Sequence, residues 1–224
     1  MAKIHQGATL TPHFRDFVPT WLARQPWYLG TGRPSVSPVG YLRVEDPAGE
    51  VGIETHLVTD GEEIYQIPMT YRGAPLPDGG LRGADPLIAT AEHSVLGRRW
   101  IYDGTADPVW INETLRLVST QGVSESGSRQ GVGPATARGR RLVQGELVPE
   151  AVTIELNRVL TVGNDNDDTG ALGLLIGTWH PGWPTGEPVS GCLAVVRATD
   201  GFDGTRSVLR SEVMGLDHSL PVEE

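Results

Sequence analysis

The sequence has little sulfur and no long apolar run. Cys192 is the one cysteine among 224 residues, which excludes an internal disulfide. The opening residues, MAKIHQGATLTPHF, lack the apolar core of a signal peptide. The longest apolar run, residues 171–177, is far shorter than the roughly 20 residues that span a bilayer. We therefore expect a soluble protein of the reducing cytoplasm that does not bind membranes.

Positive charge is scarce as well. The chain has 18 lysines and arginines against 28 aspartates and glutamates, which gives a formal net charge of −10. Contacts to phosphate dominate nucleic-acid binding, so this balance disfavours a nucleic-acid partner. The one basic cluster, Arg138, Arg140 and Arg141, is interpreted as part of a solvated segment. A chain of this length can bury roughly 70% of its unfolded surface, enough for one large or two small domains.

Motifs that bind phosphate or metal are also missing. No G-x-x-x-x-G-K-[ST] loop occurs, and no G-x-G-x-x-G joins a strand to a helix. The six histidines share no metal-ligand spacing with one another or with Cys192. Residues 164–168, NDNDD, resemble the start of a calcium loop, but Thr169 and Leu175 stand where that loop requires glycine and glutamate. We predict a solvated turn there, no metal and no cofactor.

Two segments of the first half are predicted to be helical. Residues 11–24 carry apolar side chains at three- and four-residue spacing, with Thr11 as the N-cap and a kink or interruption at Pro19. Asp107 followed by Pro108 predicts the start of a second helix, because aspartate caps the free N–H groups and proline suits the first helical position.

Alternating apolar residues predict strands between and after these helices. Asp60 and Gly61 are a strong hairpin signal between two of the strands. Residues 72–86 are rich in proline and glycine and are predicted to be a loop. Residues 171–179 fit either a helix end or a buried strand. Strands are predicted for residues 37–46, 50–60, 62–71, 93–104, 140–148, 151–162 and 190–199.

These elements predict an α+β protein of antiparallel β-sheets with a few packing helices. Residues 122–139 lack apolar periodicity and are rich in Gly and Ser, so we predict a flexible linker or loop there. The predicted organisation is a first domain over residues 1–121, this linker, and a second domain with a C-terminal tail over residues 140–224.

The first half resembles the N-terminal cap domain of the maltokinase and glucosamine-kinase family. Residues 21–34, WLARQPWYLGTGRP, are similar to the family's W-L-x-x-Q-R-W-[FY]-x-G-K-G-R signature, except that Pro26 and Thr31 replace arginine and lysine. Residues 62–72 and 100–118 resemble the cap's later strand and helix entry. The matching signature positions are Trp27, Tyr28, Gly30, Gly32 and Arg33.

The second half resembles the small lobe of such a kinase, with a degenerate nucleotide site. The family has a phosphate-holding turn and a lysine in the stretch that residues 145–160 resemble. Here the turn holds Val148, Pro149 and Glu150, and Glu155 stands in place of the lysine. Proline has no N–H to donate, and the carboxylates repel a polyphosphate. The H-x-D sequence of a kinase catalytic loop is absent, so the resemblance implies no catalytic lobe and no catalytic residue.

Four tryptophans are open to two interpretations. Each offers a flat apolar face on which a sugar ring can stack, and each also suits a buried β-rich core. These residues are Trp100, Trp110, Trp179 and Trp183.

The resemblance implies a non-catalytic accessory or regulatory protein of α-glucan, maltose or trehalose metabolism. Its expected partner is a protein, either a kinase catalytic lobe or a glucan-metabolism enzyme. Two alternatives stay open: the chain is the small-lobe half of a split ATP-dependent sugar kinase, or it is a carbohydrate-binding module that uses exposed tryptophans.

Overall fold

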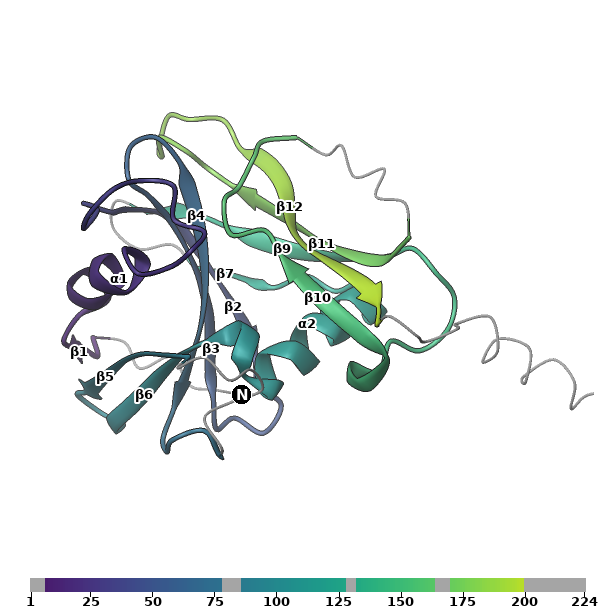
Figure 1. Ribbon diagram of the computed structural model, residues 1–224, viewed down its shortest axis with the longest axis horizontal. Coiled ribbons are helices and arrows are strands. Elements are labelled where there is room, and N and C mark those ends of the chain that lie inside the picture. The colour runs from purple at the N-terminus through teal and green to yellow at the C-terminus, as the bar shows by residue number, and fades with distance from the viewer. Residues whose placement is uncertain (1–6, 78–85, 128–131, 164–169, 200–224) are drawn as a thin grey trace, which may run out of the picture.

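The computed structural model describes residues 7–77, 86–127, 132–163 and 170–199, which fold mainly into antiparallel β-sheet with two α-helices (Figure 1). The helices are α1 (Phe14–Leu22) and α2 (Pro108–Thr120). Short 3-10 helices span Gly104–Ala106 and Pro149–Ala151. The strands are β1 (Leu10–Thr11), β2 (Ser37–Glu45), β3 (Gly52–Thr59), β4 (Ile64–Arg72), β5 (Leu87–His93), β6 (Gly97–Asp103), β7 (Glu125–Gly127), β8 (Gly133–Pro134), β9 (Thr136–Arg141), β10 (Val152–Leu156), β11 (Ala171–Trp179) and β12 (Val189–Ala198).

The strands form two sheets. The larger has the order β1-β5-β6-β4-β3-β2-β7, and β8 pairs in parallel with β2 through Gly40 and Gly133. The smaller is antiparallel with the order β10-β12-β11-β9. The α+β prediction of antiparallel sheets with a few helices agrees with this architecture. The hairpin at Asp60 and Gly61 is confirmed, because β3 and β4 pair as far as Thr59 with Ile64.

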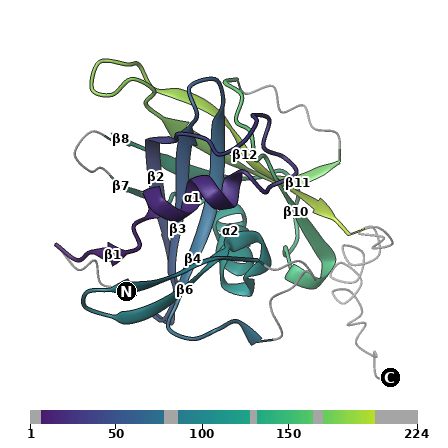
Figure 2. The same cartoon turned by 60° about the vertical axis from the view of Figure 1, so that its left-hand side comes forward.

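The large sheet is covered on both faces, by α1 on one and by the small sheet with α2 on the other (Figures 1 and 2). Alternate residues of β4 point to the first face, because side chains of a strand alternate between the two sides of a sheet. There they pack against the apolar stripe of α1. This cluster contains Phe17, Val18, Trp21 and Leu22 of the helix and Tyr65, Ile67 and Met69 of β4.

The other face of the large sheet shares its apolar core with the small sheet and α2. Leu42 and Leu57 of the large sheet, Leu117 of α2, and Trp179 and Leu193 of the small sheet belong to one buried cluster. Each of these side chains is at most 3% exposed. Fully burying such a side chain contributes about 1.5–3 kcal/mol, so this shared core holds the two sheets together.

A buried glutamine also links the two sheets. Gln66 of β4 is 1% exposed, and its Nε2 donates hydrogen bonds to the carbonyl oxygens of Asn157 and Leu193, both at 2.9 Å. The backbone N–H of Gln66 donates to the carbonyl of Arg158, and the N–H of Leu160 donates to that of Ile64. The segment between β10 and β11 therefore pairs with the large sheet.

Helix α2 begins as predicted, and α1 does not. The Asp107 side chain accepts a hydrogen bond from the N–H of Val109, and Pro108 is the first helical residue. In α1 the N-cap is His13, which exchanges hydrogen bonds with the third helical residue in a capping box. The predicted cap, Thr11, lies in β1 instead. The helix also runs through Pro19 without interruption.

Residues 122–139 are not an irregular loop over the part that the structure describes. They contain β7, β8 and the first residues of β9, with residues 128–131 outside the described ranges. Gly139 shows why the composition misled. A side chain there would collide with the backbone of Leu117 in α2, so glycine permits a close approach of strand and helix rather than mobility. The proposed boundary between two domains stays a prediction.

Other strand predictions also need correction. Strand β5 lies at residues 87–93, and no strand was predicted for residues 87–92. The strand predicted over residues 140–148 is wrong beyond Arg141, where β9 ends and the Arg141 guanidinium donates to the carbonyls of Val143 and Gly145. Residues 171–179 are a strand, β11. The predicted turn at 164–169 and the C-terminal tail from residue 200 lie outside the described residues.

Candidate functional site

A cavity of about 390 Å³ lies at one end of the two sheets. Its walls come from the start of β2, the β3–β4 hairpin, β8, and the loop after β11. Apolar side chains such as Val39 and Ile64 line one part, and Thr59, Glu62 and His180 add polar groups. The site therefore gathers four chain segments that are far apart in sequence.

Trp183 is the exposed aromatic residue of this cavity. Its side chain is 44% exposed, and its ring meets that of His180 edge to face, with 5.6 Å between centroids. The supporting loop is held by its own backbone, since the N–H groups of Thr185 and Gly186 both donate to the carbonyl of Gly182. The ring is thus presented on an ordered loop, with part of its surface open to solvent.

The acidic β3–β4 hairpin forms another part of the cavity wall. Burial acts to raise the pKa of Asp60, but hydrogen bonds from the backbone N–H groups of Glu63 and Glu62 and from the Tyr65 hydroxyl outweigh it, so the pKa lies below its usual value. Burial, aided by the hydrogen bond to Asp60, raises the pKa of Tyr65 to about 12. Asp60 therefore stays ionised at neutral pH and fixes the turn that carries Glu62.

The aromatic residues of the cap signature pack against the large sheet. The half-buried Trp27 ring lies 5.7 Å from that of Trp21 and 6.2 Å from that of Tyr65, centroid to centroid. The Tyr28 ring lies 5.5 Å from that of Tyr65. The guanidinium of Arg158 sits 4.9 Å from the centroid of Trp27, a cation–π contact between the two halves of the chain. The two signature aromatics are therefore engaged within the fold.

The remaining signature residues shape the connection from α1 to β2. A side chain at Gly30 would collide with the Tyr28 ring, and Gly32 has a φ of +68°, a conformation that favours glycine. Arg33 donates a hydrogen bond to the carbonyl of Asp16 in α1 at 3.3 Å. These contacts hold the connection from α1 to β2 in place, as expected if the signature has a structural role.

Two buried carboxylates are held by arginines. Arg72 donates two hydrogen bonds to Asp107, at 2.6 and 2.7 Å, and Asp107 is fully buried. Burial acts to raise the pKa of Asp107, but the hydrogen bond from Arg72 and that from the N–H of Val109 outweigh it, and the pKa is lowered. Arg158 forms an ion pair with Asp103. These paired acids serve the fold and do not line the cavity.

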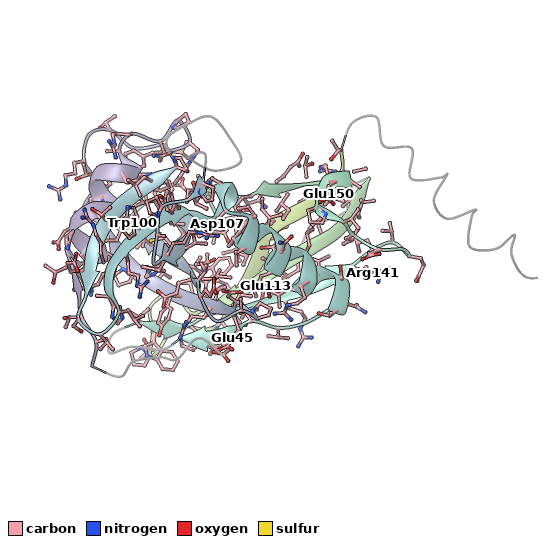
Figure 3. All side chains as sticks on the ribbon, turned by 90° about the horizontal axis from the view of Figure 1, so that it is seen from below. Glu45, Trp100, Asp107, Glu113, Arg141 and Glu150 are labelled. Atoms are coloured by element: carbon pink, nitrogen blue, oxygen red, sulfur yellow. The ribbon has the colours of Figure 1, made fainter. Side chains whose placement is uncertain are left out.

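The predicted degenerate nucleotide site lies at and just before β10 of the small sheet, and none of its residues lines the cavity. Val148 precedes a 3-10 helix that begins at Pro149, and Glu150 within it is exposed. Figure 3 shows Glu150 at the opposite side of the molecule from Trp100. Glu155 is on β10, and its carboxylate accepts a hydrogen bond from Arg197 at 2.7 Å. Glu155 is 57% exposed, so it is an acidic group on the surface.

The four candidate tryptophans fall into different environments. Trp110 and Trp179 are buried at 4% and 0% exposure and belong to apolar clusters, so they cannot stack on a sugar. Trp100 is half-buried on β6, and the Arg98 guanidinium lies 5.4 Å from its ring centroid. Trp183 is the one that lines the cavity. Sequence reasoning missed its neighbours His180 and Glu62, which carry no motif.

Two further features concern metals and membranes. Among residues 7–77, 86–127, 132–163 and 170–199, no three His, Cys, Asp or Glu side chains gather so that they could hold a metal ion. Neither helix in these ranges has the length and apolar character needed to cross a membrane.

Comparison with known proteins places the first half of the chain. No curated protein matches the sequence. Residues 21–107 match the family model of the maltokinase N-terminal cap domain, which confirms the cap-domain part of the resemblance. The match ends at Asp107, the residue that caps α2, so it spans β2 to β6 and the signature loop. Through this cap domain, residues 21–107 relate the chain to maltokinase-type proteins.

Proposed function

We propose that this protein is a non-catalytic accessory or regulatory protein of α-glucan, maltose or trehalose metabolism that acts through contact with a protein partner. The observation that carries the proposal is the combination of a maltokinase cap domain with an exposed glutamate, Glu155, where the resemblance to a kinase requires a phosphate-binding lysine. The link to this metabolism comes from the relation to maltokinase-type proteins.

The surroundings of Glu155 support a protein that does not transfer phosphate. Nucleotide phosphates are bound by backbone N–H groups in a tight turn together with a nearby cation. The corresponding turn contains Pro149, which has no N–H, and the exposed carboxylate of Glu150. The nearest cation, Arg197, is already bonded to Glu155. These groups weaken each favourable contact that a triphosphate would make.

The first experiment measures nucleotide binding to the full chain. Tight binding to the native state must raise its melting temperature by mass action. We expect ATP with magnesium, at about 5 mM, to shift the melting temperature no more than the same concentration of sodium sulfate does. A specific shift of several degrees would overturn the non-catalytic proposal.

The second experiment looks for the partner. The tagged chain is purified from native lysate at low ionic strength. The eluate is tested for co-purifying proteins and for ATP-dependent phosphorylation of maltose. We expect a stoichiometric glucan-metabolism enzyme whose own activity changes when the purified chain is added. Phosphorylation that requires both this chain and a separate catalytic polypeptide would instead establish the split-kinase alternative.

A further inference from the structure

Three polar or aromatic groups at the cavity contribute little to the fold. Within the part of the chain that the structure describes, the side chains of Glu62 and His180 make no hydrogen bond, and Trp183 contacts His180 by its ring. The side chains of Asp107 and Gln66, in contrast, are bonded to protein partners. The cavity groups are therefore available to a ligand.

The composition of the cavity wall narrows the class of that ligand. An anionic ligand is disfavoured, because Glu62 is acidic and no lysine or arginine lines the cavity. A quaternary ammonium ion is usually enclosed by several aromatic faces, and here there is one tryptophan with one histidine. A purely apolar ligand would remove Glu62 and His180 from water without a hydrogen bond, at a cost in affinity.

A neutral polyhydroxylated ring meets the remaining requirements. A pyranose has an apolar face of C–H groups and an equatorial belt of hydroxyls. The apolar face can pack against the exposed part of the Trp183 ring and against Val39 and Ile64. The hydroxyls can form hydrogen bonds with Glu62 and His180. The volume, about 390 Å³, lies in the lower part of the range of small-molecule sites.

We propose that this cavity binds a pyranose unit of a neutral saccharide, with Trp183 stacking on the ring and Glu62 and His180 bonding its hydroxyls. The site goes beyond the accessory role and does not rest on it, because it shares no residue with the degenerate nucleotide site. Protein-partner binding can fail while saccharide binding succeeds, and the reverse also holds.

The test is calorimetric titration of the full chain with maltose, trehalose and cellobiose, backed by the indole N–H resonances in a two-dimensional NMR spectrum. We expect at least one disaccharide to bind with a Kd on the order of 1 mM, because a single bound pyranose ring of about 12 non-hydrogen atoms gains about 0.3 kcal/mol per atom. The Trp183 indole resonance, assigned through its loss in Trp183→Phe, should move during the titration.

Variants identify the site. Trp183→Ala should weaken binding about tenfold or more, equivalent to the loss of one good contact. Trp183→Phe should keep part of the affinity. The matched control is Leu96→Ala, a residue 47% exposed and outside the cavity, which should leave the Kd unchanged. Melting curves check that each variant is folded.

Two results would overturn the proposal. One is the absence of heat and of resonance shifts with all three disaccharides at about 50 mM, well above the expected Kd. The other is a saccharide Kd that Trp183→Ala leaves unchanged in a folded protein. Tetramethylammonium chloride is titrated in parallel, and binding of this cation without any saccharide would reassign the cavity to cationic ligands.

Discussion

The two sheets differ in where they keep their charged pairs. At the large sheet, the carboxylates of Asp107, which caps α2, and of Asp103, which ends β6, are 0% and 12% exposed and pair with arginines. In the small sheet, Glu155 is 57% exposed and pairs with Arg197 on the surface. A buried charge that loses its partner is very costly, whereas an exposed ion pair contributes little. The first region therefore depends on its charges for folding, and the second does not.

This difference bears on the interpretation of Glu155. Because an exposed pair contributes only about 0–1 kcal/mol, the fold does not demand an acid at this position. The Asp107 pair, in contrast, joins β4 to the start of α2 and fixes the end of the segment that matches the cap model.

Asp107→Asn should have the largest effect on stability. Asparagine still caps α2, so the substitution removes the charge and leaves Arg72, whose side chain is 19% exposed, without its counter-ion. We expect the free energy of unfolding to fall by about 3–5 kcal/mol, measured by urea denaturation followed by circular dichroism. The wild-type chain should also lose stability as pH falls below 3.8, because the pKa of Asp107 is lowered by folding and the carboxylate must then be protonated.

The variant itself controls for the pH effect. Asp107→Asn cannot titrate at this position, so its stability should depend less steeply on pH below 3.8 than that of the wild type. If the variant and the wild type lose stability in parallel with falling pH, the buried pair is not the source of the acid sensitivity.

Trp27→Ala tests whether the cap signature is structural. Truncating a fully buried tryptophan costs about 3–5 kcal/mol, and Trp27 is only half-buried, so we expect about 2–3 kcal/mol. Thermal and urea unfolding measure the change. Normal stability combined with loss of a captured partner would show that this ring is a contact surface instead.

Gly139→Ala tests how closely α2 fits the small sheet. The new methyl group would meet the backbone of Leu117, and such overpacking costs about 1–3 kcal/mol. Gly52→Ala is the matched control, because the nearest atom to its new methyl group, in Tyr71, lies at an ordinary 3.4 Å. Equal stability of the two variants would contradict the close approach seen at Gly139.

Glu155→Gln should have the smallest effect. It breaks the surface pair with Arg197, and we expect a change within about 1 kcal/mol in the same urea experiment. A loss as large as that of Asp107→Asn would remove the contrast between the two sheets.

The parts of the fold that could be predicted depend on local chemistry. Asp107 and Pro108 start a helix, and Asp60 and Gly61 turn a hairpin, because each pair satisfies nearby backbone groups or supplies a required conformation. Residues 171–179 could not be assigned by periodicity. They are a strand in which the successive residues Leu174 and Leu175 are both buried, so polar and apolar residues do not alternate along it.

The missed elements depend on contacts that are distant in sequence. Strand β5 is stabilised by pairing with β6 on one side and β1 on the other. Glycine is required at position 139 because the backbone of Leu117 lies against it. The residues next to Gly139 in sequence give no sign of this contact. Thr11 is a better cap than His13 by residue preference, yet its pairing with Glu92 places it in a strand.

The candidate site was predicted only in part. The sequence did not distinguish Trp183 from the other three candidate tryptophans, because the exposure of a side chain depends on the tertiary structure. Its partners Glu62 and His180 lie more than a hundred residues apart in sequence, and the packing of the two sheets brings them to one cavity. A flanking signal existed for Trp183, since it stands between Gly182 and Pro184 in a turn, whereas Trp179 ends an apolar run.

The two hydrogen bonds that Gln66 donates across the sheets bear on how the protein can be divided. Both acceptors belong to residues beyond position 150. Leu42 and Leu57 are likewise buried against residues of the small sheet, such as Trp179 and Leu193. A fragment cut to the limits of the cap match, 21–107, would carry an orphaned amide and an open apolar face. The segment that matches the family model is thus shorter than the segment needed for a stable fragment. Fragments for biophysical work should extend through β12.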